Sequence, residues 1–372
     1  MGPISADRAR QWPAFDGVRA VAVVAVMVFH ADYPTFIKGG YVGVDIFFVL
    51  SGFLITWLLT TEHDQYGSIS YGRFYARRGL RLLPALAALI VTAVILVLAD
   101  GGLAPFRHET LVGVPFVVLY VGNWADAFGS VLTLGLLSIT WTLAIEEQYY
   151  LLWPLGLQAL LRRMDRQKIA VLLVGAAVTE QVVRFVLGLS NSNAVAAFAD
   201  KSTVTHSDGL LLGSALALMW TGRESWAWWP ALERRARDIG IAAALVLVLV
   251  IVVGESTAHV TALWITAAVY ASVVLVASLV ADPSTLLSRV LAWRPLRWIG
   301  ARSYGLYLWH FTAFSVVATL NLPQRHIHFT RFVIEFAATF AVAAVSYRVI
   351  ERPFLARKSK FARVHPEASA AT

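Results

Sequence analysis

Short clusters of basic residues divide this chain into eleven apolar segments. About 20 consecutive apolar residues are enough for a helix to cross the hydrocarbon core of a membrane. Of the 372 residues, 58% are hydrophobic and only 15% are charged, a composition typical of integral membrane proteins and not of soluble domains. We predict an all-α, polytopic integral membrane protein. The apolar segments lie at about 16–33, 41–61, 80–99, 111–123, 140–161, 169–189, 208–222, 239–254, 262–281, 303–321 and 331–350.

The positions of the basic residues predict how the helices are oriented, because loops rich in Lys and Arg tend to stay in the cytoplasm. Segment 111–123 is short and contains Gly113, Pro115 and Gly122. If this segment turns back without crossing, most of the 31 basic residues lie on one side of the membrane. If it crosses, the clusters that follow it move to the other side. We therefore predict ten transmembrane helices, one re-entrant segment and both termini in the cytoplasm.

We predict a single membrane domain with two short flanking segments. The N-terminal cytoplasmic segment covers residues 1–14, the membrane domain covers 15–354, and a basic cytoplasmic tail covers 355–372. The net charge of +8 comes from basic clusters between apolar runs, which favours contact with anionic lipid headgroups over binding of nucleic acid. The chain has no cysteine, which excludes disulfide bonds and thiol nucleophiles.

Two polar residues share one face of the first apolar segment. Arg19 and His30 are eleven positions apart. At about 100° per residue, this spacing brings them within about 20° of the same helix face and about 16 Å apart along the axis. Polar groups in a membrane interior are unfavourable and commonly functional. The alternative is that Arg19 extends to the headgroups and His30 caps the other end. This segment alone leaves both interpretations open.

Under the predicted topology, His30 lies near the outer side of the membrane together with Asp45 and Glu147. Asp45 begins the second apolar segment, and Glu147 lies within segment 140–161. A histidine beside a carboxylate is suited to general acid–base catalysis, because the carboxylate fixes the imidazole tautomer and stabilises the imidazolium ion. These three residues are therefore candidate catalytic residues. A hydrogen bond from Asp45 to a neighbouring helix, or a structural glutamate, is an equally open interpretation.

Arginines gather instead on the inner side, where Arg19 is joined by Arg78 and Arg81. Clustered guanidinium groups suit a multiply charged anion such as phosphate or pyrophosphate, through paired hydrogen bonds. An anion at the cytoplasmic face and a base half a membrane away suit a long substrate with a phosphate-bearing head. An acyl-coenzyme A is the obvious candidate. The alternative is that Arg78 and Arg81 only orient their helix.

Three polar residues share a face of segment 303–321: Ser303, Tyr307 and His310, at positions i, i+4 and i+7. They either line a substrate groove or form hydrogen bonds between helices, and we retain them as candidate substrate-binding residues. The chain has no P-loop, no dinucleotide fingerprint and no HExxH motif. We accordingly predict neither a metal site nor a permanently bound cofactor.

Seven motifs occur in order along the chain: FDGVRAVAVVAVMVFHA, GYVGVDIFFVLSGFLIT, FYARRGLRLLPA, WTLAIEEQYYLLWP, DGLLLGSALAL, SYGLYLWH and ERPF. From about Phe15 to Phe354, this ordered set closely resembles the membrane acyltransferase 3 family. Members are O-acyltransferases that modify surface polysaccharides, lipids and some antibiotics, usually with ten transmembrane helices. Many carry a fused C-terminal hydrolase-like domain, which this sequence lacks. The resemblance therefore predicts a separate partner for any second transfer step.

The resemblance implies roles for individual residues. Arg19 and His30 would be essential, with His30 as the catalytic base. Arg78 and Arg81 would handle the acyl donor from the cytoplasmic side.

Two further residues, Glu147 and Tyr149, match the family's Glu-x-(Phe/Tyr) element, here with tyrosine where phenylalanine is common. We include Tyr149 among the predicted substrate-binding residues on this ground.

From these patterns we predict a multi-pass protein of the bacterial plasma membrane. It would transfer an acyl group, most simply acetyl, from cytoplasmic acyl-coenzyme A to a hydroxyl of an envelope glycan, a glycolipid or a small metabolite. His30 would remove the acceptor's proton, with Asp45 or Glu147 stabilising the charged ring. The alternative is a transporter or flippase for a lipid-linked sugar, which would use the same polar residues without acyl chemistry.

Overall fold

The computed structural model describes residues 12–128, 134–255, 260–320 and 327–361. All regular structure in these residues is helical, without any strand, as predicted. Within them, seven helical segments are long and apolar enough to cross a membrane. They are α1 (Ala14–Ala31), α2 (Gly43–Tyr66, extended by the turn Gly40–Val42), α3 (Tyr71–Ala99), α7 (Arg166–Gly188), α11 (Trp229–Val253), α12 (Thr261–Ala281) and α16 (Ile327–Ser346, which runs on to Ala356).

The other predicted apolar segments also form helices, and these are shorter or less apolar. They are α4 (Arg107–Val118), α6 (Thr140–Leu161), α10 (Asp208–Thr221) and α15 (Ser303–Ala318). Helix α4 has 12 residues, which at about 1.5 Å per residue is well short of the roughly 30 Å hydrocarbon core. This length is compatible with a segment that turns back. The number of spans and the side of the termini remain predictions.

Local sequence signals account for where several helices begin and end. Helix α7 starts at Arg166 because the Asp165 side chain accepts a hydrogen bond of 2.9 Å from the backbone N–H of Lys168. Helix α2 ends before Gly67, whose φ of +70° lies in the left-handed region that favours glycine. Short helices connect the longer ones: α5 (Gly122–Ala127), α8 (Asn193–Lys201), α9 (Thr203–His206), α13 (Leu286–Leu291), α14 (Arg294–Gly300) and α17 (Arg352–Ala356).

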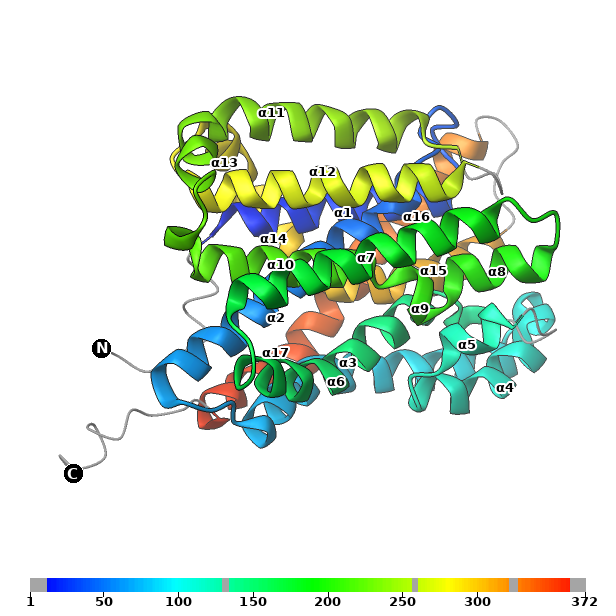
Figure 1. Cartoon of the computed structure of the whole chain (residues 1–372). Helices are drawn as coiled ribbons and strands as arrows, with labels where there is room; N and C mark the ends of the chain where they lie inside the picture. Colours follow the sequence, from blue (N-terminus) through cyan, green and yellow to red (C-terminus); the bar gives the residue numbers. More distant parts are fainter. Residues whose placement is uncertain (1–11, 129–133, 256–259, 321–326, 362–372) are drawn as a thin grey trace.

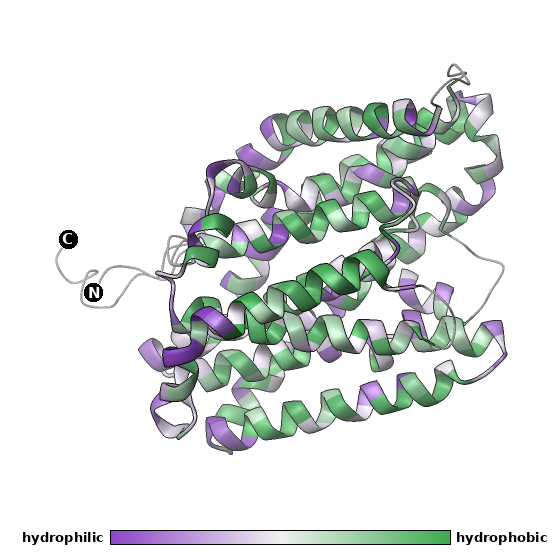
Figure 2. Ribbon diagram, turned by 90° about the horizontal axis from the view of Figure 1, so that it is seen from above, coloured by the Kyte–Doolittle hydropathy of each residue, from purple (hydrophilic) through white to green (hydrophobic). Residues whose placement is uncertain are grey.

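The long helices lie side by side, with α11 at one edge beside α12 (Figure 1). Helices α13, α14 and α17 lie at one end of the bundle, and α4, α5 and α8 lie at the opposite end (Figure 1). Hydrophobic residues run along the long helices, whereas hydrophilic residues concentrate at helix ends and in connections (Figure 2). This distribution is the one expected of a protein whose helix middles face lipid.

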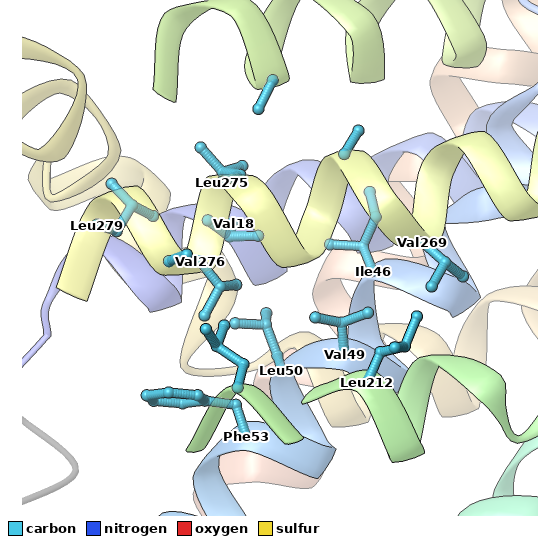
Figure 3. Close-up of a cluster of buried hydrophobic side chains, with 14 of the residues drawn as sticks. Val18, Ile46, Val49, Leu50, Phe53, Leu212, Val269, Leu275, Val276 and Leu279 are labelled. Atoms are coloured by element: carbon cyan, nitrogen blue, oxygen red, sulfur yellow. The ribbon is translucent and has the colours of Figure 1, made fainter. Parts of the chain in front are cut away.

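The largest hydrophobic cluster lies where α1, α2, α10 and α12 meet (Figure 3). Phe53 and Val49 of α2 are completely buried there, and Leu212 of α10 and Val276 of α12 pack around them. Close packing contributes more to the association of helices in a membrane than to that of helices in water, because lipid offers no hydrophobic driving force for association.

Glycine lets α2 and α10 approach closely. A Cβ atom built on Gly213 would lie 2.2 Å from the carbonyl oxygen of Val49, and one on Gly52 would lie 2.1 Å from that of Leu210. Both distances are far below van der Waals contact, and in each case the obstacle is backbone. Small residues at such crossings are what allow membrane helices to pack backbone to backbone.

We predict that Gly213→Ala lowers thermal stability, because α2 and α10 must separate to admit the methyl group. Overpacking of this kind costs about 1–3 kcal/mol. Gly175→Ala on α7 is the matched control, since nothing lies within 4 Å of a Cβ built there. Thermal unfolding of the two purified variants in detergent tests this. Equal melting temperatures for the two variants would contradict the close contact.

Candidate functional site

The predicted base His30 meets a second histidine where α1 and α15 pack together. His30 lies in the last turn of α1 and its side chain is exposed. Its Nδ1 atom lies 3.0 Å from the carbonyl oxygen of Val26 and 3.2 Å from Nε2 of His310. The two ring centroids are 4.9 Å apart. His310 is completely buried, and its Nδ1 lies 2.6 Å from the carbonyl oxygen of Tyr307.

These contacts assign the protons on both rings. A carbonyl oxygen only accepts, so Nδ1–H of His310 donates to Tyr307, and Nε2 of a neutral His310 carries a lone pair. That lone pair accepts from His30, whose Nδ1–H also points to the Val26 carbonyl oxygen. Nε2 of His30 is then left unprotonated, which is the form a general base requires. His310 thus sets the tautomer of His30.

Asp45, predicted beside His30, has another partner. Its carboxylate accepts a hydrogen bond of 3.0 Å from Nε2 of His206, and both side chains are buried, at 2% and 3% exposure. Any contribution of Asp45 to the charge on His30 remains a prediction. Of the two interpretations left open for Asp45, the hydrogen bond to a neighbouring helical segment is the one that this structure shows. The reason is helical geometry, because Gly40 and Gly43 are the residues that pack against the α1 backbone. At about 100° per residue, Asp45 points roughly 200° away from Gly43.

A buried charge network that the sequence analysis missed surrounds His206. Arg184 of α7 donates to both carboxylate oxygens of Asp208, at 2.8 and 3.0 Å. The two side chains are 2% and 0% exposed. Nδ1 of His206 bonds the carbonyl oxygen of Asp200 at 2.5 Å. Although burial opposes charge on this ring, the carboxylates of Asp45 and Asp200 raise the pKa of His206. An arginine inside apolar segment 169–189 was the available sequence signal for this network.

The predicted inner residues come together at the other end of α1. Arg81 lies close enough to Arg19 and Arg78 for their charges to interact, which agrees with the predicted gathering of arginines. Arg19 also forms a 3.0 Å ion pair with Asp16 on its own helix. Guanidinium groups in such a group repel one another unless an anion or a carboxylate lies among them.

Two glutamates of α6 face this arginine group. Tyr150 and Ser51 both donate hydrogen bonds to the carboxylate of Glu146. The guanidinium of Arg78 lies 3.5 Å above the Tyr150 ring, within range of the charge on Glu147. Among the described residues, Arg78 Nε and Glu147 Oε1 are buried without a hydrogen-bond partner. Buried groups of this kind commonly await a ligand or a water.

The predicted tyrosines form hydrogen bonds between helices. Tyr149 Oη lies 2.5 Å from Ser214 Oγ on α10, and its ring stacks on Trp153. Tyr307 Oη lies 2.7 Å from Thr142 Oγ1 on α6. Ser303 is buried at the start of α15. Contact of any of these residues with substrate remains a prediction.

Tyr307 also connects the two ends of the site. It is one turn from His310 on α15, and its partner Thr142 is one turn from Glu146 on α6. A line of polar side chains therefore runs from the histidine pair to the arginine group. Since Arg19 and His30 are about 16 Å apart along α1, the site is long.

Comparison with known protein families identifies the family of this chain. Residues 12–349 match the family model described as an acyltransferase domain. This chain belongs to the acyltransferase 3 family. The predicted family is therefore confirmed, together with the ordered motifs that indicated it.

Similar curated proteins agree with this family assignment. The chain is 33% identical over 364 residues to peptidoglycan O-acetyltransferase OatA of Listeria monocytogenes, covering 94% of this chain and 56% of that protein. It is 34% identical over 362 residues to a putative peptidoglycan O-acetyltransferase of Bacillus subtilis, covering 92% and 55%. A putative O-acetyltransferase of Staphylococcus aureus is 32% identical over 361 residues, with 93% and 57% covered. The chain thus spans just over half the length of these relatives.

No solved structure matches the chain. With bacterial relatives and several helices long and apolar enough to cross a membrane, this member of the family is a multi-pass protein of a bacterial plasma membrane.

We predict that Asp208→Asn strongly destabilises the fold, because Arg184 is left buried without a counter-charge. Breaking a buried ion pair by removing one partner costs about 3–5 kcal/mol. Lys168→Gln is the control, because its ion pair with Asp165 is exposed and should contribute little. Thermal unfolding in detergent compares the two variants. A shift no larger for Asp208→Asn than for Lys168→Gln would contradict the structural role of this network.

Proposed function

We propose that this chain is a membrane O-acyltransferase that moves an acetyl group from acetyl-coenzyme A to a hydroxyl of a cell-envelope glycan. Family membership supports the reaction class. The names of the similar proteins, peptidoglycan O-acetyltransferases, support acetyl as the group and a peptidoglycan-type glycan as the acceptor.

The observation that carries the proposal is the free Nε2 atom of His30. Its Nδ1 bonds to His310 and to the Val26 carbonyl oxygen leave Nε2 as an exposed base. In the proposed reaction, this atom takes the proton of the acceptor hydroxyl while the oxygen attacks the thioester carbonyl. The new C–O bond forms, the C–S bond breaks, and the departing coenzyme A thiolate takes the proton back from the imidazolium. Asp45 is not assigned a part, because it is paired with His206.

The arginine group supplies the donor's binding site in this proposal. Arg78 and Arg81 hold the phosphates of acetyl-coenzyme A, and the pantetheine arm extends toward His30 over roughly 16 Å. Glu147, with one buried carboxylate oxygen unpartnered, lies beside Arg78. In this proposal, Glu147 on α6 orients the guanidinium group of Arg78 toward the phosphates of the donor.

The reaction requires two-sided access. We assign the arginine group to the cytoplasm and His30 to the outer side, with ten spans, α4 as the re-entrant segment and both termini inside. The acceptor then reaches His30 from outside.

We predict that His30→Ala abolishes turnover, because no other described residue presents a free imidazole nitrogen at this position. Loss of a general base typically lowers the rate by about 100- to 10,000-fold. The measurement is release of free thiol from acetyl-coenzyme A by purified protein supplied with peptidoglycan fragments. His108→Ala is the control, since His108 is exposed and distant in sequence from the site.

Two results would contradict the proposed function. A well-folded His30→Ala protein that retains the wild-type rate removes the base from the mechanism. Wild-type protein that binds the glycan but never consumes the thioester favours the transporter or flippase instead.

We also predict that His310 acts by positioning His30. His310→Leu removes the acceptor for Nδ1–H of His30 and frees that ring to change tautomer, whereas His310→Gln can place an oxygen near the same point. The expected result is a fall in kcat of about 10- to 100-fold for His310→Leu, by analogy with groups that orient a metal-ligating histidine. KM for acetyl-coenzyme A should be unchanged, and His310→Gln should recover part of the rate. Equal losses in both variants, or a change only in KM, would exclude this role.

A further inference from the structure

The C-terminal turn packs on the arginine group. Helix α17 is followed by a short 3-10 turn, Arg357–Phe361, and both contact α3. Nη1 of Arg77 donates a 2.8 Å hydrogen bond to the carbonyl oxygen of Phe361, which fastens this turn to the first part of α3. The segment predicted as a basic tail from residue 355 is therefore folded onto the membrane domain at least as far as Phe361.

Lys358 on this turn is surrounded by cations in the part of the chain that the structure describes. The charged groups that act on it are the guanidinium groups of Arg77, Arg78 and Arg81, all on α3. Among the described residues, no carboxylate forms an ion pair with Lys358. Glu62 of α2 forms an ion pair of 3.8 Å with Arg77.

This environment is unfavourable for the ammonium group. Burial, together with the repulsion from Arg81, Arg78 and Arg77, lowers the pKa of Lys358 from 10.5 to about 7. Like charges that converge in a partly buried place raise the free energy of the empty site. A multivalent anion among them would relieve the repulsion and satisfy the unpartnered Nε of Arg78.

We propose that Lys358 completes the binding site for the phosphates of the acyl donor, so that the C-terminal turn forms one wall of that site. The ligand class is an organic polyphosphate, here coenzyme A and its thioesters. This inference rests on the proposed function, because the acyl donor is what brings phosphates to the arginine group. Anionic lipid headgroups offer the same phosphate chemistry, and the test below separates the two.

The test measures binding of coenzyme A to the full chain in detergent by titration calorimetry. Lys358→Gln should weaken binding by about tenfold, since a charged hydrogen bond is lost, while Lys358→Arg should stay close to wild type. Lys360→Gln is the matched control, because Lys360 is exposed on the same turn and should have no effect. S-acetylpantetheine lacks the nucleotide phosphates, so the wild type and the three variants should bind it with equal affinity.

The pH dependence gives a second readout. Below about pH 7, Lys358 is already charged in the free protein; above it, binding of an anion must restore the proton. Wild-type affinity should therefore fall, relative to Lys358→Arg, as the pH rises from about 7 to about 8.5. The groups facing Lys358 are arginines, which keep their charge over this range, so the difference between the two proteins reports Lys358.

The outcomes separate this inference from the proposed function. If wild-type protein binds coenzyme A and Lys358→Gln binds it equally well, only the role of Lys358 is overturned. If wild-type protein does not bind coenzyme A at all, the proposed function fails as well. If nanodiscs of anionic lipid, and not coenzyme A, show the dependence on Lys358, the site is a lipid headgroup site and the inference is overturned.

Discussion

Polar side chains in a membrane interior cannot form hydrogen bonds with lipid, and the helix arrangement of this protein depends on that constraint. Each polar group within an apolar helix has to find a partner on another helix. The ion pair between Arg184 and Asp208 joins α7 to α10. The hydrogen bond between Asp45 and His206 holds the start of α2. The carboxylate of Glu146 accepts hydrogen bonds from α2 and from its own helix. Close backbone contact between α2 and α10 is possible because Gly52 and Gly213 have no side chain at the crossing.

The same constraint distinguishes polar side chains that are fully paired within the protein from those that keep an atom without a hydrogen-bond partner. Both nitrogens of His206 are occupied by acceptors, so this ring has no lone pair to offer. His30 differs, because both of its contacts fall on Nδ1. At the inner end, Arg19 has a carboxylate close by, whereas Arg78 keeps a buried unpartnered nitrogen. Within the described residues, the charges that act on Lys358 are those of arginines. The free nitrogen of His30 and the unpartnered nitrogen of Arg78 thus lie toward the two ends of one line of polar side chains.

Much of the fold was predictable because membrane helices are encoded locally. Each of the eleven apolar segments contains a helix. The charge-based topology placed Arg19, Arg78 and Arg81 on one side, and their charges do act on one another in the structure. The sequence left two interpretations of Asp45 open, and the positions of Gly40 and Gly43 favour the one observed, because these glycines mark the face that meets α1. No local sequence pattern indicated the surroundings of Lys358, because the arginines near it belong to α3, which is far away in sequence.

The sequence by itself determined the class of this protein: an all-helical membrane acyltransferase with a histidine and arginines on opposite ends of α1. Hydrophobic length and helical periodicity fix the helices and the positions of these residues within single segments, whereas the acyltransferase family was indicated by the resemblance of the ordered motifs. Only the tertiary structure decided which polar groups are paired, that His310 sets the tautomer of His30, and that the C-terminal turn closes on α3. Hydrogen bonds between helices depend on rotation and depth to within about an ångström, and no single segment contains that information.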